Sequence, residues 1–556
     1  MDGDDTALML SGTTAEISQD KRMTENQVKN KSGGYVYAVD DMSRLRRFVC
    51  LGSENGNYYT GEKELGLENA QTIQKLIENG RGKDVVSEIT TFSVEGRAAK
   101  QNPIIFVLAM CARDDHHGDV KKAAYEAMPK ICRIPTHLFS FVEYCESLSK
   151  GTGWGRAHRR AIASWYLSQE KSAMHLAMHV TKYRNRNGWA HKDLLRLSHP
   201  KTQSEKLGLI LKYIIKGVSE AKEAYLKDES TSVDESLWTI FNFLEATETI
   251  KHCASESDVA DMILRHGLVR EHVPTQFLNS KRVWEALLEK MPMTAMLRNL
   301  AKMTVIGLIE NGSPASDTIS ARLIDEHALK KARIHPFNVL TALYTYKQGR
   351  GEKGKLKWTP VAKISQALEK AFYLSFKNVE RTNLRYCIAL DVSGSMECGG
   401  IIGNTAISPR VGSAAMSMVT ARTEKNHEFV GFSRKIVPLP ITADMDIHTV
   451  MKTVDSVPMG DTDCAQPMLW AKKYNKKFDV FIIYTDSETW AGKVHPAQAL
   501  REYRKKSGIW NAKLIVCAMT SNEFTLADPE DPGMLDMAGF DSAAPEIIRN
   551  FSLGFI

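Results

Sequence analysis

The sequence has no Cys-x-x-Cys pair, no long apolar run and little net charge, and each absence narrows the class of protein. Its nine cysteines are an odd number scattered singly between Cys50 and Cys517, which is typical of a reducing compartment rather than of a disulfide framework. No stretch approaches the roughly 18 consecutive apolar residues of a membrane span. We therefore expect a cytoplasmic or nuclear protein that does not enter a membrane.

What the chain does have is length and a globular composition. Its 556 residues are 43% hydrophobic and 25% charged, which is the profile of a folded soluble protein rather than of a disordered or fibrous one. A chain of this length exceeds what one hydrophobic core accommodates, so we expect several domains.

Positive charge is concentrated in one part of the chain. The net charge of the whole sequence is only +7, whereas residues 151–220 contain 13 lysines and arginines against four aspartates and glutamates. Charged residues that merely keep helices soluble are usually mixed in sign, but a concentration of one sign attracts polyanions. This window is therefore predicted to contact an anionic partner.

The pattern of apolar residues divides the chain into three parts. Residues 1–33 are polar and end in Ser-Gly-Gly, so they are predicted to form a flexible tail. Residues 34–380 have an almost entirely helical pattern with short links, which favours stacked helix pairs. Residues 381–556 alternate apolar strands with amphipathic helices, which predicts a doubly wound parallel sheet buried on both faces.

The expected elements follow from these periodicities. In the helical part, the clearest helices are 67–77, 104–112, 121–128, 135–147, 157–166, 207–215, 237–247, 283–289, 294–309 and 336–346. In the α/β part, the strands are 385–390, 428–432, 435–440, 480–484 and 513–519, and the helices are 413–423, 448–456, 467–474 and 496–505.

Two carboxylates and three hydroxyls are predicted to meet at the carboxyl end of the sheet, where open α/β sheets bind ligands. They follow the strands at 385–390 and 480–484 and occupy the loop before the latter. The five residues are Asp391, Ser393, Ser395, Thr462 and Asp486. Such an all-oxygen set suits a small hard divalent cation, for which we predict Mg²⁺, and leaves it able to bind an external anion. The alternative is that Asp391 caps a helix and the serines are turn residues.

This pattern resembles the metal-ion-dependent adhesion site of von Willebrand factor A domains. The resemblance implies direct ligation by Ser393, Ser395 and Thr462, with Asp391 and Asp486 holding the ion directly or through water. It also implies that the site binds a carboxylate of a protein partner rather than catalysing a reaction, so we expect no enzyme. A metal-dependent phosphohydrolase would need a second acidic residue two positions after Asp391, where Ser393 stands.

The basic window also contains aromatic residues at close spacing. Residues 154–160 and 182–192 interleave arginine, lysine and histidine with tryptophan and tyrosine. Cations neutralise phosphates, and aromatic rings offer stacking planes for unpaired bases, a combination typical of RNA binding. Arg156, Arg159 and Arg184 are accordingly predicted to contact phosphate rather than only to solvate a helix face.

Three tryptophans of this window have two interpretations. Trp154, Trp165 and Trp189 either stack on bases or anchor the stacked helices. We predict core anchors, because large aromatic side chains are mostly buried and contribute strongly to packing.

Several longer strings carry a resemblance across nearly the whole chain. They are residues 34–37, 45–48 and 52–56 and, most specifically, 132–137, 186–189 and 332–337. From residue 34 onward the sequence is similar to the TROVE family, the Ro-type ribonucleoproteins that bind Y RNA. The resemblance implies a ring of HEAT-like helical repeats over 34–380, followed by a von Willebrand factor A domain over 381–556.

The resemblance further implies two RNA sites on the helical repeats. Y RNA would bind an outer basic surface, where Lys182, Arg186 and His199 stand at the family's contact positions. Single-stranded 3′ ends of misfolded or defective small RNAs would enter the centre of the ring. Charge and motif resemblance assign four residues to that centre, namely Arg133, His137, Arg298 and Lys302.

The sequence thus predicts a monomeric, non-catalytic RNA-binding protein for small noncoding RNAs, acting in RNA quality control and ribonucleoprotein scaffolding. A Mg²⁺ site in the A domain would serve a separate, carboxylate-bearing protein partner. The main alternative is a protein-interaction platform, in which the helical repeats and the A domain both bind polypeptides without RNA.

Overall fold

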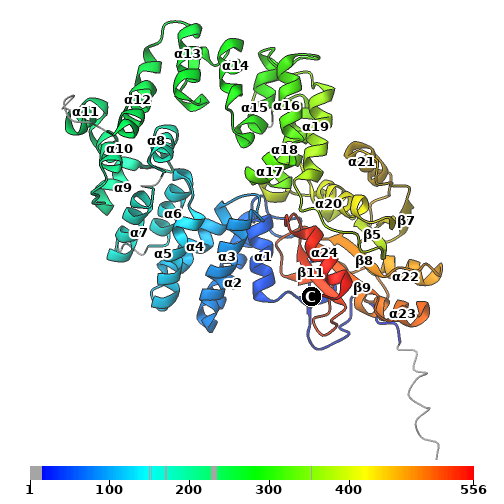
Figure 1. The fold of residues 1–556 in the computed structure, drawn as a ribbon. Coiled ribbons are helices and arrows are strands. Elements are labelled where there is room, and N and C mark those ends of the chain that lie inside the picture. Colours follow the sequence, from blue (N-terminus) through cyan, green and yellow to red (C-terminus); the bar gives the residue numbers. More distant parts are fainter. Residues whose placement is uncertain (1–14, 150, 152, 170–171, 227–233, 352–353) are drawn as a thin grey trace, which may run out of the picture. The chain divides into compact units, whose positions relative to one another are not determined.

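The computed structural model describes residues 15–149, 151, 153–169, 172–226, 234–351 and 354–556 (Figure 1). The chain forms two compact units. One, the A unit, combines residues up to Leu67 with residues from Asn378 onward, and the other, the helical unit, spans Glu68–Lys377. Residues 34–67 therefore pack with the α/β part of the chain rather than with the helices.

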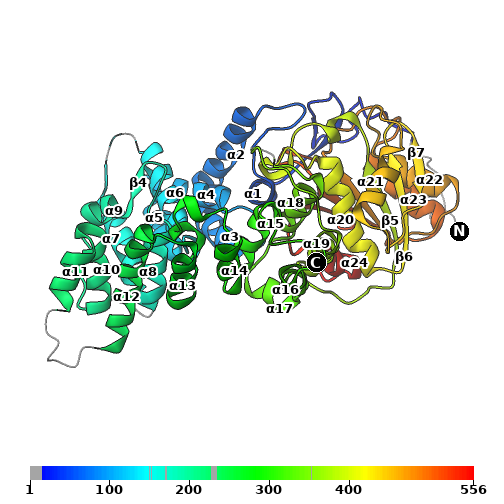
Figure 2. The same cartoon turned by 90° about the horizontal axis from the view of Figure 1, so that it is seen from above.

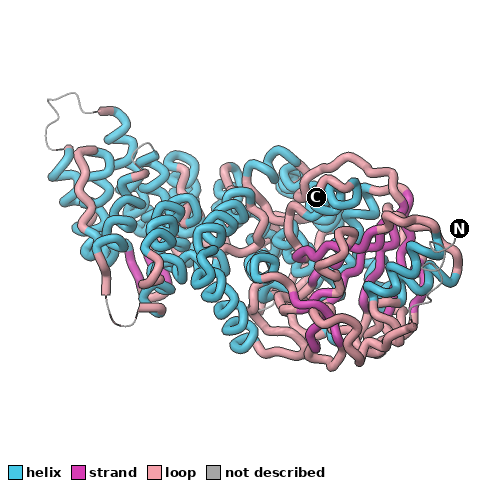
Figure 3. The backbone as a smooth tube through the Cα atoms, turned by 90° about the horizontal axis from the view of Figure 1, so that it is seen from below, coloured by secondary structure: helices cyan, strands magenta, loops and turns pink. Residues whose placement is uncertain are grey.

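In the described residues, the helical unit consists mainly of α-helices on short links together with a small hairpin, as the cyan and magenta segments of Figure 3 show. Its hairpin is formed by β3 (Asn185–Arg186) and β4 (Trp189–Ala190). Its helices are α2 (Glu62–Leu76, which begins in the A unit), α3 (Gly82–Glu95), α4 (Asn102–Arg113), α5 (Gly118–Ile131), α6 (Pro135–Ser147), α7 (Arg156–Leu167), α8 (Ala173–Lys182), α9 (His191–Ser198), α10 (Glu205–Lys216), α11 (Val218–Tyr225), α12 (Glu235–Thr249), α13 (Glu256–His266), α14 (Lys281–Glu289), α15 (Met293–Val305), α16 (Pro314–Leu323), α17 (Glu326–Lys331), α18 (Pro336–Gln348) and α19 (Ala362–Leu374).

Successive helices of this unit pack against one another, for example α4 on α5, α13 on α14 and α18 on α19, as in HEAT-like arrays. The two ends of the array also meet. Nε2 of His335 lies 3.0 Å from the backbone oxygen of Arg97, which is 238 positions away, and Nδ2 of Asn338 donates to the oxygen of Ala99 at 3.5 Å. The succession of helices therefore closes on itself, and the predicted helical-repeat architecture is confirmed.

The A unit is built around a six-stranded sheet in the order β11-β9-β8-β5-β6-β7 (Figure 2). Its strands are β5 (Arg385–Asp391), β6 (Asn426–Phe432), β7 (Ile436–Leu439), β8 (Val480–Thr485), β9 (Lys513–Ala518) and β11 (Met534–Ala538). The predicted α/β domain is confirmed, but the sheet is mixed, because β7 pairs antiparallel with β6. The link 433–435 permits only a hairpin, since a parallel pair needs a crossover of about a dozen residues or more.

Helices cover both faces of this sheet, and alternate strand residues point to opposite layers. On one face, Ala389 of β5 and Ile483 of β8 belong to a buried apolar cluster that includes residues of α22 (Gln466–Lys473) and α23 (Pro496–Ser507). On the other face, α20 (Pro409–Thr423) contacts β5 and β8 (Figures 1 and 2). The remaining helices of the unit are α1 (Asp41–Leu51), which contacts β11, α21 (Ile447–Asp455) and α24 (Ala544–Leu553).

The flexible tail predicted for residues 1–33 is wrong for residues 15–33, while residues 1–14 lie outside the described residues. In the A unit, β1 (Gln27–Lys29) pairs with β2 (Tyr35–Ala38), and β2 pairs with β10 (Phe524–Thr525). Gln19 is fully buried. The polar composition was misleading because these polar groups are satisfied by hydrogen bonds to residues more than 400 positions away, a distance over which composition carries no signal.

None of the helices in the described part of the chain is both long enough and apolar enough to cross a bilayer. All nine cysteines are free thiols; Cys398 is exposed and Cys253 half-buried, whereas the others are buried.

Candidate functional site

The carboxyl ends of β5 and β8 bring the predicted cation ligands of the A unit together. Asp391 ends β5, and its Oδ1 accepts a hydrogen bond from the backbone nitrogen of Ser393 at 2.9 Å. The hydroxyls of Ser393 and Ser395 lie 3.2 Å apart, and Ser395 hydrogen-bonds to Asp486, the residue after β8. All four side chains are buried, so four oxygen-bearing groups from two strand ends converge as predicted.

Thr462 joins this edge of the sheet from the loop before α22. Its backbone oxygen accepts hydrogen bonds from the amides of Trp490 and Ala491 at 3.1 and 3.0 Å, so its loop lies against the loop that follows Asp486. Thr462 is itself buried. The structure therefore places all five predicted ligands at one sheet edge.

Burial, and in two cases a neighbouring carboxylate, raise the pKa of the carboxyl groups at this edge. Burial raises the pKa of Asp391, and burial together with the charge of Asp391 raises the pKa of Asp486 to about 7. Burial and Asp486 likewise raise the pKa of Glu488 to about 8. Carboxylates crowded in a water-poor site are unfavourable alone and are stabilised by a divalent cation between them.

The donor set fits a hard cation rather than a transition metal. Among the described residues no cluster of three or more His, Cys, Asp or Glu side chains could hold a metal ion, so hydroxyl oxygens must complete any coordination here. In addition, Oγ of Ser487 and Oε1 of Glu488 are buried without a hydrogen-bond partner. A small ion that accepts hydroxyl, carboxylate and water ligands, such as Mg²⁺, suits this chemistry.

Two further residues beside this edge escaped the sequence analysis. Burial and the charges of Asp486 and Glu488 raise the pKa of Tyr59, which places its ring close to these carboxyls. Glu488 is two residues from Asp486, and its Oε2 accepts from the backbone nitrogen of Ser32 at 3.0 Å. Position relative to Asp486 could have flagged Glu488, whereas nothing in the sequence connects Tyr59 with residues more than 300 positions away.

The basic window folds into neighbouring elements of the helical unit. α7 contacts α9, and the β3–β4 hairpin contacts α6 and α9. These elements and the link after α9 carry exposed cations that form the basic surface: Arg156, Arg159, Arg160, Arg186, Lys192, Arg196 and Lys201. No ion pair neutralises any of them within the described ranges. Exposed charges of one sign without counter-charges are what a polyanion-binding surface requires.

Arg186 and His199 are the most available of the residues assigned to Y RNA. Arg186 is exposed in the hairpin, opposite Trp189. The turn between them is Asn187-Gly188, both with positive φ (54° and 78°), the pattern of a two-residue hairpin turn. His199 is exposed after α9 in a left-handed conformation with φ 48°. The Asn-Gly pair was a local hairpin signal that the sequence analysis did not use.

Lys182 and Arg184, by contrast, have acidic partners. Nζ of Lys182 lies 4.0 Å from Oε2 of Glu271, and its side chain is only 16% exposed. Nη2 of Arg184 lies 3.1 Å from Oε1 of Glu248. Either cation must therefore share or exchange its acidic partner before it neutralises a phosphate fully.

Of the four residues assigned to the centre of the helical array, the structure brings two together. Burial and the nearby charge of Arg133 lower the pKa of His137 to about 4. Arg298 and Lys302 lie one turn apart on α15, where Nζ of Lys302 donates to Oδ1 of Asn279 at 2.6 Å. No hydrogen bond or ion pair links the two pairs in the described part of the chain.

Arg333 is a basic residue that the sequence analysis missed. After burial, its charge is the largest cause that lowers the pKa of Arg133, so the two guanidinium groups are near each other although 200 positions separate them. Arg333 is exposed, has a left-handed backbone with φ 51° and makes no ion pair within the described residues. Two neighbouring arginines without an acidic partner suit a phosphate group.

The tryptophans of the basic window divide into two kinds. Trp165 is 1% exposed and its Nε1 donates to the backbone oxygen of Cys132, so the predicted core role is confirmed for it. Trp154 and Trp189 are half-buried and lie against each other with ring centroids 5.9 Å apart. Trp154 therefore packs against Trp189 of the hairpin that carries Arg186.

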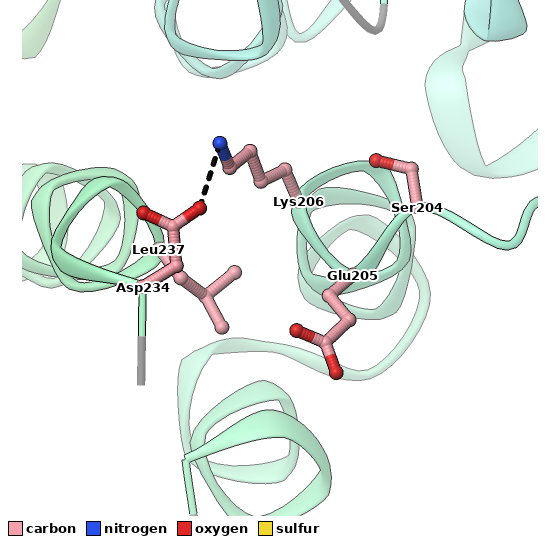
Figure 4. Close-up of a pocket in the computed structure, with 5 residues that line it drawn as sticks. All are labelled: Ser204, Glu205, Lys206, Asp234 and Leu237. Atoms are coloured by element: carbon pink, nitrogen blue, oxygen red, sulfur yellow. Dashed lines mark ion pairs between the residues drawn. The ribbon is translucent and has the colours of Figure 1, made fainter. Parts of the chain in front are cut away.

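A small polar pocket of about 280 Å³ lies where α10 and α12 begin (Figure 4). Its lining residues are Ser204, Glu205, Lys206, Asp234 and Leu237. Nζ of Lys206 lies 2.9 Å from Oδ2 of Asp234, as the dashed line shows. Lys206 is thus already neutralised and does not belong to the basic surface, although it lies in the basic window.

The helical unit also buries several neutral histidines. Burial lowers the pKa of His158, His191 and His272 to about 4. His158 is packed among aromatic rings, with Trp154 edge-on at 4.5 Å and Phe141 stacked at 5.9 Å. Such groups must stay unprotonated while the unit is folded.

We expect the folded chain to lose stability between pH 6.5 and 4. In that window the unfolded state protonates histidines that the folded state keeps neutral, so stability is complete above pH 6.5 and falls as the pH drops towards 4, by up to about 1.4 kcal/mol per pH unit for each histidine. The free energy of unfolding, measured with urea between pH 7 and 5, should fall less steeply with decreasing pH in His158→Phe than in wild type. The exposed His327→Gln is the control, and equal slopes in all three proteins would contradict this interpretation.

Comparison with known proteins places these units in a family. The TROVE domain family matches residues 28–344 and 343–383, and the family described as Ro60 vWA domain matches residues 385–552. The chain is 41% identical over 596 residues to the RNA-binding protein RO60 of Caenorhabditis elegans, covering 97% of this chain and 92% of that protein. It is 37% identical over 538 residues to the RNA-binding protein RO60 of Deinococcus radiodurans, with coverage of 96% and 97%.

A solved structure agrees with the sequence comparisons. The crystal structure of the Deinococcus radiodurans RO (RSR) protein matches with a TM-score of 0.68 and 35% sequence identity, over 93% of this chain and all of that one. The two family domains follow one another along the chain as the helical part and the A domain do. The chain therefore belongs to the TROVE family of Ro60-type proteins.

Proposed function

We propose that this protein binds small noncoding RNAs, Y RNAs among them, through the basic surface of its helical unit. The observation that carries the proposal is the set of exposed cations on α7, β3, α9 and the following link, none of which is paired with an acidic side chain in the described ranges. Charges that are already unpaired bind phosphates without first giving up an ion pair. The names of the two relatives, RNA-binding protein RO60, support RNA as the polyanion.

A second class of RNA is proposed to bind a separate group of basic residues in the helical unit. Arg133, His137 and Arg333 lie near one another and offer cations together with an imidazole. A single-stranded 3′ end exposes phosphates and unstacked bases to such groups, whereas a duplex does not. Capture of the free 3′ ends of misfolded or defective small RNAs would place the protein in RNA quality control and ribonucleoprotein scaffolding.

The A unit is proposed to hold Mg²⁺ for a separate partner. Ser393, Ser395 and Thr462 would ligate the ion, with Asp391 and Asp486 as its carboxylates. When bound, Mg²⁺ supplies a coordination position that accepts a carboxylate oxygen of a protein partner. The chain's own part is to align these oxygens, which the bond from the Ser393 amide to Asp391 and the contact between the two serine hydroxyls already do.

The protein would act as a monomeric scaffold without catalysis, in the cytoplasm or the nucleus. Its unpaired thiols support a reducing compartment. The seven residues of the basic surface are arginines and lysines, which suit phosphate binding, whereas cleavage would need a nucleophile activated by a base.

Crosslinking in living cells followed by RNA sequencing tests this function against a protein-interaction platform. Ultraviolet crosslinking of the tagged full-length chain should recover Y-type RNAs and small RNAs with unpaired 3′ ends far above an untagged control. Recovery at background level would contradict RNA binding and would favour the platform.

A further inference from the structure

The N-terminal segment, residues 15–38, makes polar contacts with the loops of the cation site. Gln19 is fully buried, and its Nε2 donates to Oδ1 of Asp463 and to the backbone oxygen of Val494, both at 2.8 Å. Its Oε1 accepts from the hydroxyl of Thr489. Its backbone nitrogen donates to the oxygen of Gly492 at 2.9 Å. One amide side chain and its backbone thus link the residue after Thr462 with the loop after Asp486.

Asn30 holds the same loop from a second point. Its Nδ2 donates to the backbone oxygens of Thr489 at 2.8 Å and Ser487 at 3.4 Å. Its own Oδ1 accepts from the backbone nitrogen of Gly34 at 2.8 Å, which fixes the amide in that orientation. Asn30 is only 5% exposed, so these bonds form away from bulk water, where a lost partner is costly.

Two glycines show how closely the segment and the loop approach. A Cβ on Gly34 would lie 2.0 Å from the backbone oxygen of Thr489, and a Cβ on Gly492 would lie 2.2 Å from Nε2 of Gln19. At Gly34 the obstacle is backbone, so no side chain fits there, whereas a side chain at Gly492 would displace the amide of Gln19. The contact is therefore a close-packed seam rather than a loose association.

The loop at this seam also contacts Thr462, one of the predicted cation ligands. The loop held by Gln19 and Asn30 contains the amides of Trp490 and Ala491, and these donate to the backbone oxygen of Thr462. The position of Thr462 thus depends on a loop whose other side is bonded to the N-terminal segment. Partners of this kind orient ligands without touching the ion.

We propose that the N-terminal segment is a built-in part of the cation site and that Gln19 and Asn30 are its positioning residues. Through loop 487–492 they hold Thr462 and Asp486 in the arrangement that receives the ion. The proposal rests on the cation site proposed above, but it adds that residues more than 400 positions from Thr462 and Asp486 set the affinity for the ion.

Mn²⁺ binding to the full-length chain, measured by titration calorimetry, is the test. We expect Gln19→Ala and Asn30→Ala each to weaken Mn²⁺ binding about tenfold or more, as loss of an outer partner does in other metal sites. The matched control is Gln27→Ala. Gln27 is a buried amide of the same segment, but it bonds to Met23 and His495 and should change the affinity less than about twofold.

Hydrogen exchange of peptides covering 486–492, recorded without metal, gives an independent readout. Exchange should rise in Gln19→Ala and Asn30→Ala but not in Gln27→Ala. If wild type itself binds no Mn²⁺, the cation site fails, and the exchange data alone decide whether the segment positions the loop.

Three outcomes would overturn the proposal: unchanged exchange in Gln19→Ala and Asn30→Ala, unchanged Mn²⁺ affinity in both when wild type binds, or equal losses in all three variants. If Gln19→Ala does not fold, Gln19→Met replaces the amide by an apolar side chain of similar length and so removes the side-chain bonds to Asp463, Val494 and Thr489. Gln19→Met should then show the same loss of Mn²⁺ affinity, and wild-type affinity in that variant would contradict the proposal.

Discussion

Replacing Lys182 and Arg186 together by alanine should weaken the binding of a structured Y-type RNA about 30-fold or more at physiological salt. Each charge-assisted hydrogen bond to phosphate contributes roughly 1.5–3 kcal/mol, and each tenfold change in affinity corresponds to about 1.4 kcal/mol. Arg186 should account for the larger share, because it has no acidic partner among the described residues, whereas Lys182 lies 4.0 Å from Glu271. Filter binding or fluorescence anisotropy with the full-length chain measures the effect.

The matched control for this pair is Lys206→Ala together with Lys212→Ala. Both lysines lie in the same window of the sequence, and their removal changes the net charge equally. They are paired with Asp234 and Glu220 at 2.9 and 3.8 Å, so we expect less than about a threefold loss. Equal losses for the two double variants would show that net charge alone, and not the unpaired cations, sets RNA affinity.

Replacing Asp391 by alanine should abolish Mg²⁺ and Mn²⁺ binding to the A unit and leave RNA affinity within about twofold of wild type. The ion loses a buried carboxylate, whereas the basic surface belongs to the helical unit. Calorimetry with Mn²⁺ and anisotropy with RNA, on the same protein preparation, measure both effects. Retention of Mn²⁺ affinity would contradict the assigned ligand set.

Asp391 also orders its own turn, since it accepts from the Ser393 amide at 2.9 Å and from the hydroxyl of Thr485 at 2.6 Å. Asp391→Asn keeps the side-chain oxygen for one of these bonds and removes only the charge, so it serves if the alanine variant does not fold. Asp444→Ala, at an exposed acid of the same unit, is the control for charge. Collapse of RNA binding in a folded Asp391 variant would contradict the proposed division between the two units.

Much of the architecture was predictable because its signals are local. Two of the predicted helices begin in the structure at Pro135 and Pro336, as proline in the first turn of a helix indicates. The strands β5 and β8 were visible as continuous apolar runs, and their order placed Asp391 and Asp486 at one edge. The antiparallel β7 was equally predictable from the short link before it, had loop length been considered.

What the sequence could not predict depends on partners far apart in the chain. The segment at Gln19 has a polar composition typical of a tail, and only its bonds to Asp463 and Val494 make it part of a core. Strand β11 (Met534–Ala538), with an acidic residue at its centre, has no clear apolar run and is defined by its pairing with β9. Composition and periodicity report neither kind of contact.

The candidate sites show the same limit. The five cation ligands come from motifs beside strand ends, so spacing alone identified them. The RNA-binding residues were identified by charge, and charge does not show that Glu248 and Glu271 pair with Arg184 and Lys182. The proximity of Arg333 to Arg133 likewise appears only when the two ends of the helical array are brought together.

The salt dependence of RNA binding tests the central claim most directly, namely that the unpaired cations of the helical unit bind phosphates. Affinity for one Y-type RNA is measured for wild type and for the Lys182→Ala, Arg186→Ala double variant between 50 and 250 mM KCl. We predict a steep linear fall of log K with log salt for wild type and a slope shallower by about 1 to 2 for the variant, since each phosphate contact contributes about 0.7 to 0.9. Parallel lines, or a flat response of the wild type, would contradict the claim.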